Sequence, residues 1–129
     1  MRGYGILAGA MVLAGCEAGA PATSDAEAAF VSEPVPLPNG TQFTAVVAEG
    51  AQPAAMTAAA QEFCGAKDWC QVMAWREEAN VPRQMPMLER ESDSIAFSYL
   101  MNRSTGYEQI LWDCRIWEGP PESCVEPGR

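Results

Sequence analysis

The clearest periodic pattern of apolar residues lies between Pro53 and Cys64. Apolar side chains recur there at three- and four-residue intervals, which places them on one face of a helix. Pro53 suits the first helical turn because its missing N–H would have no partner there, and Gly65 is suited to ending the helix. The sequence therefore predicts a helix over residues 53–64, with its apolar face formed by Met56, Ala59, Ala60, Phe63 and Cys64.

Three later segments have the alternation or the composition of β-strands. They are residues 69–76, 94–101 and 107–117, and a turn over residues 102–106 joins the last two. Residues 42–48 are a further strand candidate because β-branched and aromatic residues are frequent among them. This order of elements predicts an α+β fold, in which one helix packs on a three- to four-stranded antiparallel sheet.

The first apolar run of the chain, Tyr4 to Ala14, ends at Leu13-Ala14-Gly15-Cys16. It is too short to cross a hydrocarbon core, which takes about 20 residues. The four residues at its end resemble the lipobox of bacterial lipoprotein signal peptides. That resemblance implies removal of residues 1–15 and attachment of lipid to Cys16, whereas a plain secretory signal is the alternative reading.

Acyl chains such as palmitate on Cys16 would hold the protein on a membrane of the bacterial cell envelope, facing the periplasm. Glu17 follows the cysteine, and this resembles the outer-membrane sorting signal of enteric bacteria. We therefore expect a lipid anchor and favour the outer membrane over the inner membrane.

Residues 17–40 differ from the rest of the chain because Ala, Pro, Gly, Ser and Glu dominate them. Such a composition buries too little apolar surface to offset the entropy of ordering. We expect residues 16–40 to form a flexible tether and residues 41–129 to form one small domain. A domain of that size has a marginal hydrophobic core unless it is cross-linked.

Four cysteines remain for the predicted domain: Cys64, Cys70, Cys114 and Cys124. An even number in an exported chain is typical of two disulfides, whereas the absence of His argues against a zinc site. Crossed pairing would add about 4 kcal/mol per bridge to the free energy of unfolding. Pairing of each cysteine with the next one along the chain would add only about 2.4 and 2.8 kcal/mol. Geometry favours the neighbours, because a helix end and the next strand start lie close together. We expect the local pairing.

The chain has 8 basic and 17 acidic residues, a net charge of −9. Removal of residues 1–15 would delete only Arg2 and leave a net charge of −10. Because nucleic-acid binding needs clustered Lys and Arg, this composition argues against a nucleic-acid partner. An acidic surface attracts cationic partners, so inhibition of a cationic enzyme such as lysozyme is one alternative function.

Tryptophans on or beside the predicted strands suggest a binding surface. Trp112 falls on a strand face that reads as core, whereas Trp117 falls on the opposite face together with Asp113 and Arg115. Trp75 is a further candidate for that second face. Aromatic side chains rimmed by charges are typical of protein interfaces and glycan platforms. We predict an interface of these four residues, Trp75, Asp113, Arg115 and Trp117; the alternative is that another segment covers them.

Candidate catalytic groups are few. Without His, a Ser-His-Asp or Cys-His arrangement is impossible, and no phosphate-binding glycine motif occurs. Glu108 and Asp113 lie an odd number of residues apart on one predicted strand and would point to opposite faces. The acidic residues within 77–93 read as solvent-exposed. We expect no enzymatic activity and no cofactor or metal, with a small carboxylate-based hydrolase as the second alternative.

Three short segments, residues 63–64, 69–72 and 111–114, resemble small exported proteobacterial proteins of unknown role, and this resemblance implies no activity. We therefore interpret the chain as a lipid-anchored envelope protein whose domain is a non-catalytic binding or accessory module. Its partner would be a protein or an envelope glycan. The binding surface would be the sheet face or the loop over residues 77–93.

Overall fold

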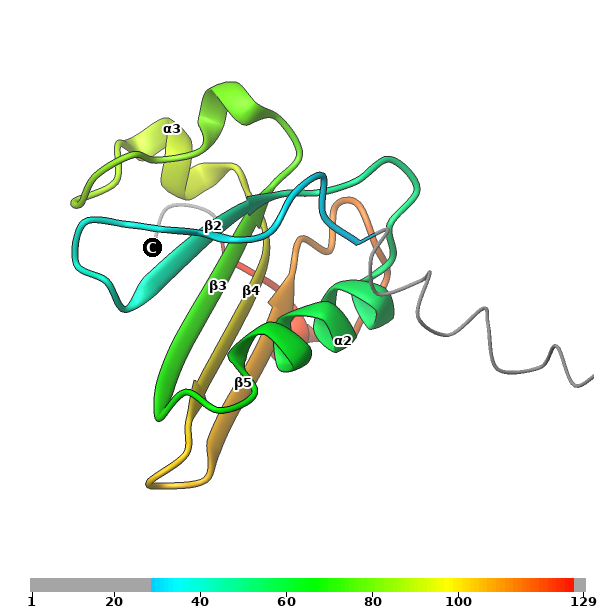
Figure 1. Cartoon of the computed structure of the whole chain (residues 1–129). Coiled ribbons are helices and arrows are strands. Elements are labelled where there is room, and N and C mark those ends of the chain that lie inside the picture. Colours follow the sequence, from blue (N-terminus) through cyan, green and yellow to red (C-terminus); the bar gives the residue numbers. More distant parts are fainter. Residues whose placement is uncertain (1–28, 127–129) are drawn as a thin grey trace, which may run out of the picture.

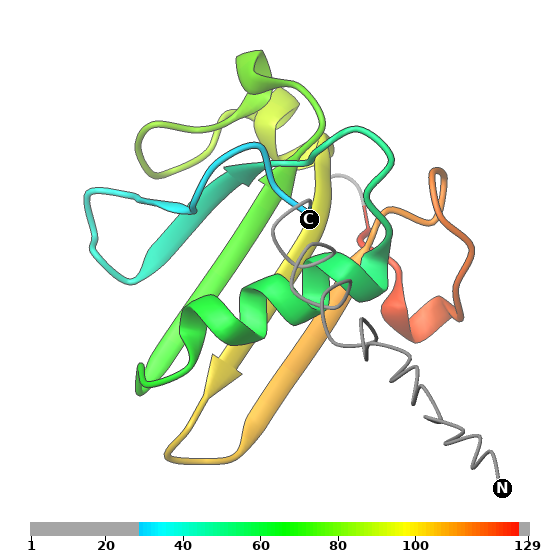
Figure 2. The same cartoon turned by 45° about the vertical axis from the view of Figure 1, so that its right-hand side comes forward.

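The computed structural model describes residues 29–126, and its central element is a five-stranded mixed sheet (Figure 1, Figure 2). The strands lie in chain order across the sheet: β1 (Val35–Pro36), β2 (Gln42–Val46), β3 (Trp69–Trp75), β4 (Ile95–Asn102) and β5 (Tyr107–Trp112). The helix α2 (Pro53–Cys64) packs on one face of this sheet. The shorter elements of the described part are η1 (Glu78–Asn80), α3 (Glu89–Asp93) and η2 (Pro121–Ser123).

The helix α2 has the predicted bounds. Pro53 occupies its first turn, and the N–H of Gly65 bonds the carbonyl of Glu62 just past its end. Because α2 carries the chain back along the sheet, β3 runs parallel to β2, with Gln42 opposite Gln71. The expectation of an entirely antiparallel sheet is therefore wrong at this pair, whereas the other strand pairs are antiparallel.

The main core lies between α2 and the sheet. Two rows of side chains cross four strands on this face: Phe43, Val72, Tyr99 and Ile110 in one, and Ala45, Ala74, Phe97 and Trp112 in the other. Met56 and Ala60 of α2 are fully buried against them. The small side chains of β2 and β3 leave room for the helix to approach closely. The α+β class and the single packed helix are thus confirmed, with more strands than expected.

The segment before residue 41 is part of this packing, in contrast to the expected tether. Ala29 and Leu37 are buried, and β1 pairs with β2 through Val35 opposite Thr44. Pro36 is tolerated because β1 is an edge strand, where a missing N–H breaks no ladder. The predicted boundary at residues 40–41 is therefore wrong for residues 29–40. The predicted signal peptide, Cys16 and residues 16–28 lie outside the described residues.

Both disulfides join sequence neighbours, as expected: Cys64 with Cys70 and Cys114 with Cys124. The first links the last residue of α2 to the start of β3 across a short loop. The second ties the segment after β5 to Cys124, whose backbone forms a parallel bridge with Trp112. The two cross-links therefore hold opposite ends of the sheet.

Candidate functional site

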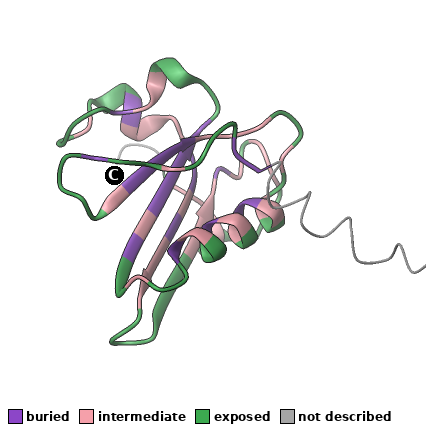
Figure 3. Ribbon diagram, in the orientation of Figure 1, coloured by how far each residue is buried: buried purple, intermediate pink, exposed green. Residues whose placement is uncertain are grey.

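The face of the sheet that α2 leaves free is divided into two halves. Trp69, Gln71, Met73 and Trp75 alternate along β3 and share this face. Met73 and Trp75 are 2% and 0% exposed, whereas Trp69 is 36% exposed. Figure 3 shows the same change in burial along the strands: the buried residues gather towards the end of the sheet at which α3 lies. One half of the face is therefore covered and the other half is open.

The cover consists of segments from two distant parts of the chain. A second apolar cluster surrounds Met73 and Trp75 and is completed by Leu37, Val81, Met87 and Ile95. The indole N–H of Trp75 donates to the carbonyl of Glu91 at 2.7 Å. Trp75 is thus a core residue beneath the 76–93 segment, and its predicted place in an exposed interface is wrong.

Glu91 shows why that segment packs so closely. Its carboxylate accepts the backbone N–H of Leu88 at 2.7 Å and thereby satisfies a free donor at the start of α3. The side chain is only 7% exposed, in contrast to the solvent-exposed acidic run expected from the sequence. The loop over residues 77–93, which was predicted as an alternative binding surface, therefore covers part of the sheet. We call the segment over residues 76–93 the lid.

The open half consists of facing residues on four strands. Trp69 lies opposite Asn102, which lies opposite Tyr107, and the next row contains Gln42, Gln71, Leu100 and Gln109. Tyr107 is 50% exposed, and the others are exposed or half-buried. We call this surface the open face; it consists of Gln42, Trp69, Gln71, Leu100, Asn102, Tyr107 and Gln109. None of its side chains is charged.

Side-chain amides on the open face are held in a defined arrangement. The Nδ2 of Asn39 donates to the Oε1 of Gln42 at 2.6 Å, and the Nε2 of Gln42 donates to the Oε1 of Gln71 at 2.7 Å. The oxygen of Asn39 in turn accepts the backbone N–H groups of Thr41 and Gln42. Within residues 29–126, the Nε2 of Gln71 donates no hydrogen bond to another residue. The chain of amides thus ends in an available donor.

The other three predicted interface residues lie elsewhere. β5 ends at Trp112, and the backbone N–H groups of Ile116 and Trp117 both bond the carbonyl of Asp113. The predicted strand alternation therefore fails after Trp112, because residues 113–117 form a helical turn. Trp117 packs partly against the main core and also lines a hollow of about 340 Å³ beside Arg76.

Asp113 and Arg115 form a clasp rather than an open charged surface. The guanidinium of Arg115 contacts both carboxylate oxygens of Asp113, the closer pair of atoms at 2.8 Å, and donates to the carbonyl of Asp93 at 3.2 Å. These hydrogen bonds lower the pKa of the buried Asp113 carboxyl below its ordinary value. Because Asp93 is the last residue of α3, the clasp ties the lid to the turn after β5.

The carboxylates considered for catalysis are separated and engaged with other groups. The Oε2 of Glu108 accepts the hydroxyl of Tyr99 at 2.6 Å on the helix face, whereas Asp113 bonds Arg115 beyond the end of the strand. Burial, together with this hydrogen bond to Glu108, raises the pKa of Tyr99 to about 12. The two carboxylates therefore do not face a common substrate position.

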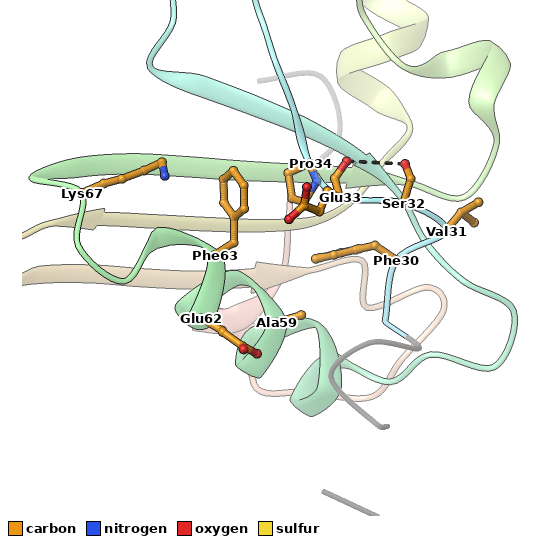
Figure 4. Close-up of a pocket in the computed structure, with 9 residues that line it drawn as sticks. All are labelled: Phe30, Val31, Ser32, Glu33, Pro34, Ala59, Glu62, Phe63 and Lys67. Carbon is orange, nitrogen blue, oxygen red and sulfur yellow. Dashed lines mark hydrogen bonds between the residues drawn. The ribbon is translucent and has the colours of Figure 1, made fainter. Parts of the chain in front are cut away.

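A groove of about 590 Å³ lies on the helix side of the sheet (Figure 4). Residues 30–34 form one wall, and Phe63 and Glu62 of α2 form the other. The ammonium group of Lys67 lies 4.6 Å from the centre of the Phe63 ring and 5.6 Å from that of Phe43. Lys67, the only lysine of the chain, therefore covers the rings of Phe43 and Phe63, and packing explains these contacts.

Comparison with known proteins gave no match, neither to a family model, nor to a curated protein, nor to a solved structure. Within residues 29–126, no three His, Cys, Asp or Glu side chains gather as they would around a metal ion. No helix of that part is long and apolar enough to span a membrane. The sequence predicted a binding surface on the sheet face but did not single out Trp69 or Gln71, although the alternation of both with Cys70 already placed them on one side of a strand.

Proposed function

We propose that this chain is a lipid-anchored protein of the bacterial cell envelope, and that its domain is a non-catalytic binding module acting through the open face. The observation that carries the proposal is that two aromatic side chains, Trp69 and Tyr107, remain exposed on the open face, whereas the other half of the same sheet face is covered around Met73 and Trp75. Exposed aromatic groups on a rigid sheet are typical of recognition surfaces.

The anchor and the disulfides support the cellular setting of the proposal. The lipobox-like Leu13-Ala14-Gly15-Cys16 supports attachment of lipid to Cys16, and disulfides are typical of compartments outside the cytoplasm. The two bridges between sequence neighbours stiffen the sheet at both ends. A rigid surface loses little conformational entropy on binding, which favours recognition without a conformational change.

Binding to the envelope can be separated from anchoring by the Cys16→Ser variant, which has no thiol to carry a thioether-linked lipid. We expect this variant to co-sediment saturably with envelope fragments of a Gram-negative host, and the wild-type chain to float with membranes irrespective of the open face. In the anchorless background, Trp69→Ala should weaken co-sedimentation by about tenfold, because aromatic side chains dominate binding energies.

The matched control is Gln84→Ala, which removes an exposed side chain from the lid, away from the open face. It should leave co-sedimentation unchanged. Absence of saturable binding by the anchorless chain, or equal binding by Trp69→Ala, would contradict the proposed function. Flotation of Cys16→Ser with membranes to the same extent as the wild type would contradict the anchor.

A further inference from the structure

The open face combines exposed aromatic rings with side-chain amides and carries no charge. We propose that it binds a neutral glycan built of N-acetylated sugars. This ligand class depends on the binding function proposed above, because it assigns the occupant of the same face.

The aromatic rings are spaced for a chain-like ligand. Trp69 and Tyr107 lie at the two ends of one row, with Asn102 between them. Neighbouring strands are about 4.8 Å apart, so the two aromatic residues stand about 10 Å apart across the sheet. An aromatic ring packs against the C–H face of a sugar and keeps its polar edge free. Two such positions in one row match two sugars of an extended chain.

The amides supply the polar part of the recognition. A carboxamide both donates and accepts hydrogen bonds, which matches hydroxyl and acetamido groups. Gln71 is already oriented by its bond from Gln42, which is itself held by Asn39. Its remaining donor is therefore available at little entropic cost. Gln109 lies in the same row and is exposed.

The charge distribution argues against an anionic or a cationic ligand on the open face. The chain carries 17 acidic and 8 basic residues, so an anionic polymer is repelled by the molecule as a whole. A cationic partner would find no carboxylate on the open face. A neutral, hydroxyl-rich ligand is the class for which an uncharged face of amides and aromatic rings is complementary.

The test is an NMR titration of the lipidated chain in detergent micelles with a β-linked oligomer of N-acetylglucosamine. The indole N–H groups of Trp75 and Trp112 donate to backbone carbonyls, to Glu91 and Glu118 respectively. We expect the Trp69 indole signal to shift with saturation, and the Trp75 signal to stay in place. Because the ligand is neutral, the affinity should change little with salt. An oligogalacturonate, which is anionic, should not bind.

Four variants test the residues of the open face, and Gln84→Ala is the control. Trp69→Ala and Tyr107→Ala should each weaken the affinity by about tenfold, and Trp69→Tyr should restore most of it because the ring is retained. Gln71→Ala should weaken it a few-fold, since it removes one hydrogen bond. Gln84→Ala should have no effect. A cooperative unfolding transition of each variant, with a midpoint well above the titration temperature, shows that its fold is intact, and the wild-type titration needs no variant.

The outcomes separate this inference from the proposed function. Saturable binding that moves the Trp69 signal and is lost in both aromatic variants supports the glycan. Absence of glycan binding, while the anchorless chain still binds envelopes through Trp69, overturns the glycan and leaves a protein partner for the same face. Glycan binding that persists in both aromatic variants overturns the assignment of the site.

Discussion

Trp69 and Trp75 stand on the same face of the same strand, yet one is 36% exposed and the other is fully buried. The difference arises from segments far away in the chain. Leu37 and Val81 cover Trp75, and the carbonyl of Glu91 accepts its indole N–H. No described segment covers Trp69 to the same extent or accepts a hydrogen bond from its indole N–H. A strand pattern tells which side chains share a face, but not whether that face will be covered.

The two halves also differ in chemistry, and this difference fits their environments. The covered half is apolar, with Met73 and Trp75 at its centre. The open half replaces these with amides at Gln71 and Gln109, which remain hydrogen-bonded when exposed to water. An apolar patch of the same size would favour aggregation. The open face is therefore compatible with solvent and available for a polar ligand.

We expect the largest effect from substituting Trp75, and its comparison with Trp69 tests the difference between the two halves. We expect Trp75→Ala to lower the free energy of unfolding by about 3–5 kcal/mol, because it leaves a cavity in the second apolar cluster. Trp69→Ala should lower it by about 1 kcal/mol or less, because its side chain is already partly in water. Urea unfolding of both variants measures the difference. Equal losses would mean that the open face is covered in solution.

A second test concerns the disulfide that holds the open end. Replacing Cys64 and Cys70 by Ala should lower the free energy of unfolding by about 2–3 kcal/mol, as expected for a short closed loop. Cys70 lies between Trp69 and Gln71 on the buried side of β3. We expect the backbone amides near Trp69 to lose protection in hydrogen exchange, while those near Trp75 keep it. Uniform loss of protection would show that the two halves unfold as one unit.

The smallest effect is expected from the clasp that holds the lid. Arg115→Ala removes the hydrogen bonds that lower the pKa of Asp113. A carboxyl with a lowered pKa stabilises the fold above its ordinary value of 3.8 and loses this contribution as the pH falls through the lowered value. The variant should therefore be less stable than the wild type at neutral pH, and the gap should close in acid.

The clasp prediction is checked by unfolding midpoints measured from neutral to acidic pH. Arg103→Ala is a suitable control, because Arg103 also lies at a turn but makes its side-chain bond to the carbonyl of Lys67 instead of a carboxylate. Its stability difference from the wild type should not close in acid. A constant difference for Arg115→Ala across this range would show that the Asp113 contact contributes nothing to the lid.

Local patterns predicted the elements whose signals are contained within one segment. The helix over residues 53–64 was bounded by Pro53 and Gly65 and faced the sheet through Met56 and Ala60. The strands β3 and β4 were predicted to within about one residue of their bounds. The pairing of the disulfides was predicted from the closeness of a helix end to the start of the next strand, which favours local over crossed pairing.

Long-range pairing explains the errors. β1 contains Pro36 and was read as tether, because an edge strand is recognised only through its partner β2. The strand over 107–117 was predicted too long, since the turn after Trp112 depends on the hydrogen bonds to the Asp113 carbonyl. Gly119 is a similar case, because a Cβ there would lie 2.6 Å from the Trp112 ring. None of these contacts is visible along the chain.

The sequence by itself determined the helix, the alternation of the main strands and the positions of the cysteines, because these depend on neighbouring residues and on chain stereochemistry. Only the tertiary structure decided which half of the free sheet face is exposed. That outcome depends on where Leu37 and the 76–93 segment come to rest, and their positions follow from packing against residues far away in the chain. The surface offered for binding is what those distant segments leave uncovered.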